Sequence, residues 1–191
     1  TPRAESTPYA RCFAIFGLHL LRDDSRLTAG ADEWAVAIRE DLDAYRQERA
    51  ALGVMLERDK PYLQLLTFSL SALSVLDRLG TIPLSEHVTA ALSKDVDADF
   101  AATGVLQGAA GSGNQAMMMA ILLLYARAHL GLDTSRPLER WTSLLLGSRN
   151  RFGFWGATRS MSHLQFQNGY HQYEIFEYLG AGAYAGKGNR E

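Results

Sequence analysis

The sequence predicts an all-α protein, and three observations support this prediction. Apolar residues recur at helical spacing through most of the chain, and strand-like alternation of β-branched residues is almost absent. Glycines also follow several of the apolar segments, where a helix would end. A chain of 191 residues with 47% hydrophobic and 21% charged residues is long enough for a sizeable core. We therefore expect a single helical domain over residues 1–191.

Eight helices are expected, and two of them show why the helices differ in role. The segment 61–79 has two apolar faces separated by a narrow polar stripe, so it should pack on two sides as an inner helix. The segment 32–51 has one apolar stripe, on which Trp34, Ile38 and Leu42 lie, and a charged remainder, which is typical of an outer helix. In chain order the expected helices span 8–28, 32–51, 61–79, 84–93, 97–108, 114–130, 137–147 and 167–179.

The sequence also has a period of about fifty residues. Four glycines stand in similar contexts after apolar segments, at intervals of 50, 51 and 49 residues: Gly30, Gly80, Gly131 and Gly180. Glycine favours the left-handed conformation that closes a helix, so each glycine is a candidate helix end. The period predicts repeated hairpins of a long apolar helix followed by an amphipathic helix.

This pattern resembles the α/α-toroid proteins, which include six-hairpin glycosidases, toroidal polysaccharide lyases and terpenoid cyclases. The most similar part is "PLERWTSLLLGSRNRFGFWG" followed by "QNGYHQYEIFEYLG". The resemblance implies a toroid or partial toroid of helical hairpins. Three hairpins and one final inner helix are too few for a closed ring. We therefore expect an open array, a part of a larger protein, or a ring completed by an oligomer or another chain.

Composition excludes several classes of function. A formal net charge of −2 gives no reason to expect nucleic acid or an anionic membrane as a partner. Cys12 is the only cysteine, so an internal disulfide and a thiolate metal cluster are excluded. The five histidines show no tight metal-binding spacing, and we expect neither a metal nor a cofactor. The longest apolar run, 116–126, is too short to span a membrane, and residues 1–10 show no signal peptide, so a soluble protein is expected.

The main candidate site lies in the expected helix 167–179. His171 and Glu174 share one helical face, and Asn168 and Tyr170 lie at its N-terminal end. The resemblance to polysaccharide lyases implies that Asn168 binds a uronate carboxylate and that His171 or Tyr170 removes the α-proton. A glycosidase would instead pair Glu174 with one of three acids, Asp95, Asp97 or Asp99. The alternative is that these polar groups cap the helix and bond within an interface.

Other candidates for substrate binding come from two loops. Asn114 and Gln115 begin an inner helix and would share the rim with Asn168 if the repeat holds, although Ser112 or Asn114 could simply be the N-cap. Trp155 could stack on a sugar ring or anchor its loop on the hairpin below. Arg151 and Arg159 flank this loop and could meet a carboxylate or phosphate, or remain solvated.

The acidic stretch 94–100 offers oxygen ligands for calcium or magnesium, but it lacks the other features of an EF-hand loop. The simpler interpretation is that one of its acids caps the next helix. Two classes of function remain. The first is a carbohydrate-active enzyme that eliminates or hydrolyses a glycosidic bond, with a terpenoid-type cyclase as a variant. The second is a non-catalytic helical scaffold that binds a peptide or another subunit.

Overall fold

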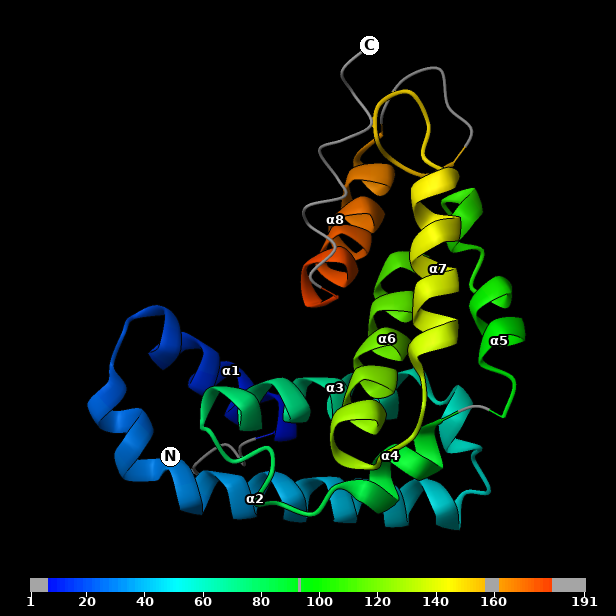
Figure 1. Ribbon diagram of the computed structural model, residues 1–191. Helices are drawn as coiled ribbons and strands as arrows, with labels where there is room; N and C mark the ends of the chain where they lie inside the picture. The colour runs from blue at the N-terminus through cyan, green and yellow to red at the C-terminus, as the bar shows by residue number, and fades with distance from the viewer. Residues whose placement is uncertain (1–6, 93, 157–161, 180–191) are drawn as a thin grey trace. The chain divides into compact units, whose positions relative to one another are not determined.

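The computed structural model describes residues 7–92, 94–156 and 162–179. These residues form eight α-helices and two short 3-10 helices, and they contain no strand (Figure 1). The prediction of an all-α fold is confirmed. The chain divides into two compact units, unit 1 over residues 1–91 and unit 2 over residues 92–191, and each is described by itself.

Unit 1 is a bundle of three helices with two short additions. Its elements are α1 (Pro8–Leu20), α2 (Asp24–Ala51), the 3-10 helix η1 (Leu56–Arg58), α3 (Lys60–Val75) and α4 (Ser85–Ala91). Helices α1, α2 and α3 each contact the other two, and α4 packs on α3 and η1. The Tyr9 hydroxyl donates to the Pro61 carbonyl at 2.9 Å, and the Phe16 ring lies edge-on to Phe68. Helices α1 and α3 therefore run side by side in the same direction.

The core of unit 1 comes mainly from α3 and from single stripes of α1 and α2. Cys12 and Ile15 of α1 and Ile38 and Leu42 of α2 are each about 1% exposed or less. This agrees with the expected outer role of α2, because its remaining faces carry the charged residues. Burial raises the pKa of the Cys12 thiol to about 11, although a hydrogen bond with Ser69 opposes the shift.

An ion pair fixes the junction between α2 and α3. The Arg49 guanidinium donates to both carboxylate oxygens of Asp59, at 2.6 and 3.0 Å, and lies over the Tyr45 ring. The Asp59 side chain is only 4% exposed, so its charge depends on this two-point contact. A lysine could not reproduce the planar fork that makes both bonds.

Unit 2 has two helical layers. Its elements are α5 (Val96–Ala102), the 3-10 helix η2 (Val105–Gln107), α6 (Ser112–His129), α7 (Ser135–Gly147) and α8 (His163–Tyr178). Helices α6 and α8 pack along each other in the same direction, while α7 runs the opposite way and contacts both (Figure 1). Helix α5 packs on α7, where the Phe100 and Trp141 rings stack at 4.5 Å.

A glycine allows α6 and α8 to approach closely. A Cβ atom added at Gly113 would lie 2.3 Å from the Asn168 carbonyl oxygen, so no larger residue fits at this crossing. The next residues of α6 on the contact side, Ala116 and Ala120, are also small and fully buried. The backbones are therefore in direct contact, and this packing sets which face of α8 is turned away from the core.

Four helices end at a residue in the left-handed backbone conformation, each preceded by a leucine at the C-cap. These residues have φ between 56° and 69°: Arg22, Gly53, Asp77 and Gly131. The helix end expected at Gly131 is confirmed. The ends expected at Gly30 and Gly80 are wrong, because Gly30 lies within α2 and α3 already closes at Asp77. Gly180 lies outside the described residues.

Several other boundaries differ from the prediction. The expected helix 8–28 ends at Leu20, and α2 already begins at Asp24. Helix α8 begins at His163, so Asn168 and Tyr170 do not lie at its N-terminal end as expected.

The expected helix 97–108 is divided into α5 and η2 because Gly104 and Gly108 both adopt positive φ. Helix α6 starts at Ser112 after the left-handed Gly111, so neither Ser112 nor Asn114 is the N-cap. The expected acidic cap is confirmed, since the Asp95 carboxylate accepts from the Ala98 amide at 3.0 Å.

Candidate functional site

Helix α8 brings together three of the residues predicted to be catalytic. The helix begins at a capping box, in which Ser162 and Gln165 exchange hydrogen bonds with each other's backbone amides. Its buried face holds Gln165, Asn168 and Gln172, so the positions between them point elsewhere. The Glu174 carboxylate accepts from His171 Nδ1 at 2.9 Å and also bonds the Tyr170 hydroxyl.

The Glu174 carboxylate contacts its two partners in different ways. A carboxylate only accepts hydrogen bonds, so the Nδ1 atom of His171 carries the proton and a neutral ring leaves Nε2 as an acceptor. The hydrogen bond to Glu174 and the charge of that carboxylate raise the pKa of the Tyr170 phenol. The cluster therefore places the imidazole of His171 beside a phenol whose pKa is raised.

Two residues predicted to bind substrate lie in the core of unit 2. Asn168 is 3% exposed, and its amide donates to the carbonyl oxygens of Gly108 and Ala109 at 3.3 and 2.7 Å. Trp155 is 1% exposed, and its indole donates to the Leu145 carbonyl at 2.8 Å. Asn168 therefore holds the loop at Gly108 and Ala109, and Trp155 anchors its own loop on α7. Both contacts agree with the structural alternatives given in the sequence analysis, namely bonding within an interface and loop anchoring.

Among the described residues, the other predicted binding residues make no contact with His171. Asn114 and Gln115 lie half-buried in the first turn of α6, next to the Gly113 crossing with α8. The Arg151 guanidinium lies 4.7 Å above the Phe152 ring. Arg159 lies outside the described residues.

Two of the three acids proposed as partners of Glu174 are engaged at helix α5, and the third, Asp99, lies in the first turn of the same helix. Asp95 caps that helix, and the Asp97 carboxylate accepts from Arg140 at 2.6 Å and from the Trp141 indole at 3.0 Å. These contacts tie α5 to α7 and give both carboxylates a structural role. A hydrolytic pair with Glu174 therefore gains no support from them.

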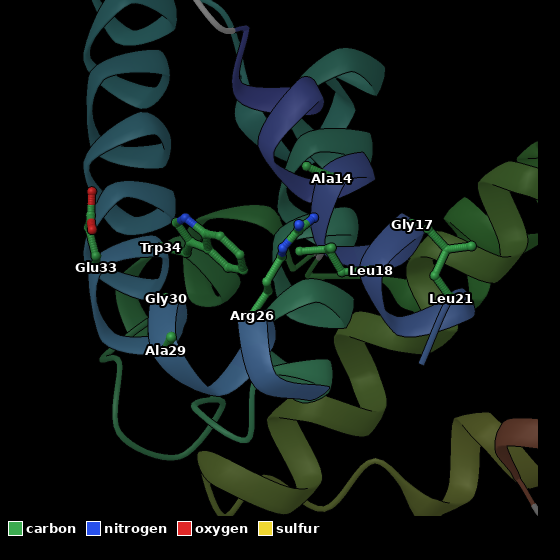
Figure 2. Close-up of a pocket in the computed structure, with 9 residues that line it drawn as sticks. All are labelled: Ala14, Gly17, Leu18, Leu21, Arg26, Ala29, Gly30, Glu33 and Trp34. Carbon is green, nitrogen blue, oxygen red and sulfur yellow. The ribbon is translucent and has the colours of Figure 1, made fainter. Parts of the chain in front are cut away.

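A separate feature of unit 1 is an apolar groove between α1 and α2, with a volume of about 600 Å³. An added Cβ at Gly30 would lie 2.7 Å from the Trp34 ring, so the indole lies directly across the helix backbone. At Gly17 no atom lies within 4 Å of an added Cβ, so the other wall is open. Figure 2 shows the lining residues: Ala14, Gly17, Leu18, Leu21, Arg26, Ala29, Gly30, Glu33 and Trp34.

One lining residue of this groove is an almost fully exposed leucine. Leu21 is 79% exposed and its neighbour in sequence, Leu20, is 81% exposed. An exposed leucine beside small residues marks a surface that favours an apolar partner. The sequence does not indicate the groove, because it predicts a helix end at Gly30 and one continuous helix over 8–28.

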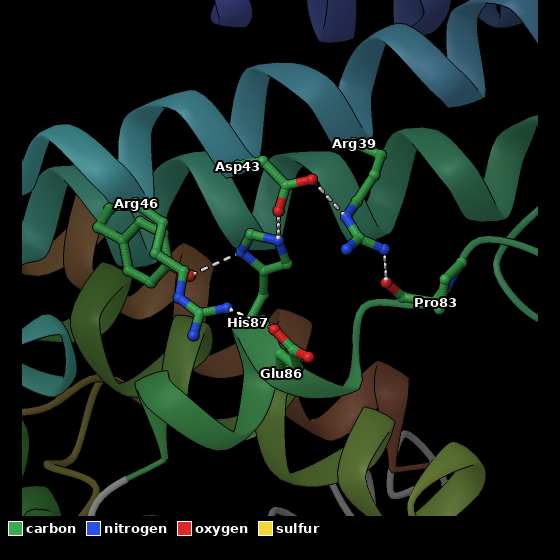
Figure 3. A network of polar contacts seen from close by, with 7 residues as sticks. Arg39, Asp43, Arg46, Pro83, Glu86 and His87 are labelled. Carbon is green, nitrogen blue, oxygen red and sulfur yellow. Dashed lines mark hydrogen bonds and ion pairs between the residues drawn. The ribbon is translucent and has the colours of Figure 1, made fainter. Parts of the chain in front are cut away.

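Unit 1 also contains a buried polar network that no sequence motif indicated (Figure 3). The Tyr62 hydroxyl bonds His87 Nδ1 at 2.9 Å, and His87 Nε2 bonds the Asp43 carboxylate at 2.9 Å. Arg39 completes the network by donating to Asp43 and to the Pro83 carbonyl. Together these contacts join α2, α3 and α4.

The network keeps His87 neutral and closed to solvent. Burial lowers the pKa of His87, against the opposing effect of the hydrogen bond to Asp43. Burial would raise the pKa of Asp43, but hydrogen bonds from Arg39 and His87 outweigh it and lower that pKa. Burial raises the pKa of Tyr62 to about 12. Since Tyr62 and His87 are 0% exposed, no substrate can reach them and their role is structural.

Gln172 is a buried polar side chain without a described partner. It is 0% exposed on the packed face of α8, and neither its amide nitrogen nor its amide oxygen has a hydrogen-bond partner. An amide in this state costs about 1–3 kcal/mol of stability. The unpaired Gln172 amide therefore lowers the stability of unit 2, and it does not belong to the cluster of Tyr170, His171 and Glu174.

Comparison with protein-family models, with curated proteins and with solved structures found no match. Among the residues that the structure describes, no helix is long and apolar enough to cross a membrane. The same residues contain no group of three His, Cys, Asp or Glu side chains that could hold a metal ion.

Proposed function

We propose that the protein is a helical-hairpin interaction module that binds an apolar α-helix of a partner in the groove between α1 and α2. The groove itself carries this proposal. Its lining contains small residues at Ala14, Gly17, Ala29 and Gly30, together with the exposed Leu21 and the Trp34 ring. A helix with an apolar face can place a large side chain over Gly17, pack beside the Trp34 ring and cover Leu21.

The order of the helices supports a repeated array as the framework of this module. Four helices, α1, α3, α6 and α8, begin at residues 8, 60, 112 and 163, which is a spacing of 51 or 52 residues. In unit 1, α1 and α3 pack side by side and the more polar α2 contacts both; in unit 2, α6 and α8 pack side by side and α7 contacts both. This layering is similar to that of α/α-toroid proteins. We infer that the chain is built from hairpins of this kind.

Trp34 provides the test, because the other two tryptophans are buried in unit 2. Titration with a leucine-rich amphipathic helical peptide should shift the Trp34 emission to shorter wavelength in a saturable way. Gly17→Phe should abolish the shift by filling the open wall, whereas Val36→Glu, an exposed change elsewhere on α2, should retain it. An equal response in Gly17→Phe, or no response in the unmodified chain, would contradict the proposal.

A second function is favoured by the cluster on α8, namely the elimination or hydrolysis of a saccharide. Its support is that Glu174 holds both His171 and Tyr170, so that His171 Nε2 could act as general base and the Tyr170 phenol as acid. The amide of Asn168, which was expected to bind a uronate carboxylate, does not support this function, because it donates to a backbone carbonyl in the core.

This second function is tested by incubation with neutral and uronate-bearing oligosaccharides. Chromatography detects new reducing ends, and ultraviolet absorbance detects the unsaturated sugar that an elimination forms. His171→Ala should abolish turnover, while His163→Ala, an exposed histidine on the same helix, should not. Absence of any product, or equal turnover in both variants, would count against the enzyme.

A further inference from the structure

We propose that α4 is a pH-sensitive element of unit 1, which undocks from α2 and α3 when His87 takes up a proton and thereby exposes Tyr62. The inference goes beyond the functions proposed above, because it involves neither the groove nor the cluster on α8. It rests on the hydrogen bonds and charges that surround one buried titratable side chain.

Helix α4 is held in unit 1 by a small apolar contact. It has seven residues, and its buried apolar side chains are Val88 and Ala91, with Leu84 directly before the helix. His87 lies on the same side, because residues three and four positions apart on a helix are neighbours. A helix of this length is not stable alone in water, so α4 keeps its structure only while it is docked.

Neutral His87 completes this contact with all of its hydrogen bonds made. The Asp43 carboxylate only accepts, so His87 Nε2 carries the proton and donates to it at 2.9 Å. His87 Nδ1 accepts from the Tyr62 hydroxyl, also at 2.9 Å. The ring therefore has no free acceptor, and both of its bonds run to other helices.

A second proton on the ring would break this pattern at Tyr62. Protonated His87 Nδ1 donates, so the Tyr62 hydroxyl must accept and turn its own hydrogen away. No other hydrogen bond of this hydroxyl is present among the described residues, and Tyr62 is 0% exposed. Burial also raises the pKa of Tyr62 to about 12, so the phenol does not lose that hydrogen. Protonation therefore leaves a buried donor without a partner, unless α4 moves away.

The charges that face His87 from α2 also oppose protonation. Asp43 attracts a positive ring, but the Arg39 guanidinium already donates to that carboxylate at 2.8 Å. Burial lowers the pKa of His87 most, and the charges of Arg39 and Arg46 lower it further against the effect of Asp43 (Figure 3). One carboxylate is thus shared by two cations as soon as His87 is protonated.

The other elements packed on α4 supply no charge that would stabilise a protonated His87. Helix α3 presents the Tyr62 hydroxyl, which is neutral. Glu86 of α4 itself has a side chain that is 73% exposed. The 3-10 helix η1 carries Glu57 and Arg58, and neither is bonded to His87.

Docking of α4 should therefore be complete above about pH 6.5, the ordinary histidine value, and weaken below it. The undocked state binds the proton more readily, so its population relative to the docked state rises by at most about tenfold per pH unit. The remaining bundle should stay folded, because α1, α2 and α3 each contact the other two. The expected change is a local opening of α4.

Hydrogen exchange followed by mass spectrometry between pH 8 and 5 tests the inference on the full chain. Protection factors are compared, because they remove the intrinsic pH dependence of exchange. Protection of residues 84–91 should fall by up to about tenfold per pH unit below pH 6.5, while that of α1 and α2 stays constant. His87→Gln should abolish this fall, because the glutamine amide can donate to Asp43 and accept from Tyr62 without titrating. His171→Gln is the matched control and should behave like the unmodified chain.

A second pair of variants decides the matter if His87→Gln leaves α4 unprotected even at pH 8. Arg46→Gln and Glu86→Gln break the same ion pair, whose atoms lie 3.0 Å apart. Only Arg46→Gln removes a charge that repels a protonated His87, so it should weaken the acid response, whereas Glu86→Gln should retain it.

Three results would overturn the inference. The first is constant protection of α4 in the unmodified chain from pH 8 to 5. The second is an equal loss of protection in α1, α2 and α4, which would indicate unfolding of the whole unit. The third is an acid response that persists in His87→Gln or that is equal in Arg46→Gln and Glu86→Gln.

Discussion

The two units each contain a histidine, a tyrosine and a carboxylate in mutual contact, but the arrangements differ. In unit 1 His87 is the central group, bonded to Tyr62 on one side and to Asp43 on the other. In unit 2 the central group is the Glu174 carboxylate, which bonds both His171 and Tyr170. The first network is closed to solvent at its histidine, and the second lies on a helix flank with His171 22% exposed.

This difference shows that burial, and not residue type, separates a structural network from a candidate chemical one. Both nitrogens of His87 are used, so the ring can neither accept nor release a proton without breaking a bond between helices. His171 uses one nitrogen and keeps the other available. The same three side-chain types therefore hold helices together in unit 1 and form a partly exposed cluster on one helix in unit 2.

The largest expected effect comes from removing the buried histidine. His87→Ala should destabilise unit 1 by about 3 kcal/mol, because it leaves a cavity and deprives the buried Tyr62 hydroxyl of its partner. Chemical denaturation followed by Trp34 emission measures this. A loss below about 1 kcal/mol would show that the network contributes little to the docking of α4.

Gln172 extends the comparison to a buried polar group with no partner. Gln172→Leu should stabilise unit 2 by about 1–2 kcal/mol, because the unpaired amide is replaced by an apolar side chain of similar size. The denaturation midpoint, followed by Trp141 and Trp155 emission, is the readout. Gln167→Leu, at an exposed position of the same helix, should change it by less than about 0.5 kcal/mol. A destabilised Gln172→Leu would indicate that the amide has a partner in solution.

The pH dependence of unit 1 should follow His87. Its pKa is lowered in the folded state, so the unfolded chain binds a proton that the folded chain excludes. Stability is therefore complete above about pH 6.5, the ordinary histidine value, and is lost as the pH falls below it, by at most about 1.4 kcal/mol per pH unit. Denaturant titrations between pH 8 and 5 should show this slope in the unmodified chain and in His171→Gln, but not in His87→Gln. Equal slopes in all three proteins would assign the effect to other groups.

The smallest effect is expected at the exposed cluster. His171→Ala should change the free energy of unfolding by less than about 0.5 kcal/mol, since its ion pair with Glu174 is partly solvated and joins neighbours on one helix. Thermal or chemical denaturation measures it alongside His87→Ala. A loss comparable with that of the buried histidine would remove the distinction between the two networks.

Much of the helical framework could be predicted from the sequence, because apolar periodicity records which faces are buried. The inner character of α3 and the outer character of α2 follow from this pattern. The helix ends at Arg22 and Asp77 could not be found by a search for glycine. Both residues adopt the left-handed conformation despite a steric cost of about 1 kcal/mol, offset by the hydrogen bonds that close the helix.

The cluster on α8 was predictable for a similar reason, since residues three and four positions apart on a helix are neighbours. The burial of Asn168 was not, because it depends on the Gly108 and Ala109 carbonyls, 60 and 59 residues away, and that of Trp155 depends on how its loop folds back on α7. The partners in the His87 network are likewise separated by 25 and 44 residues, and no local spacing indicates them. The groove depends on the turn at Arg22, which brings α2 back along α1.

The single thiol of the chain gives access to the dynamics of one unit. Cys12 is 1% exposed in the core of unit 1, and burial raises its pKa to about 11, so it is shielded from reagents while that core is closed. The rate at which a thiol reagent modifies Cys12 therefore reports how often the core of unit 1 opens. Because no other cysteine reacts, the measured rate contains no contribution from unit 2.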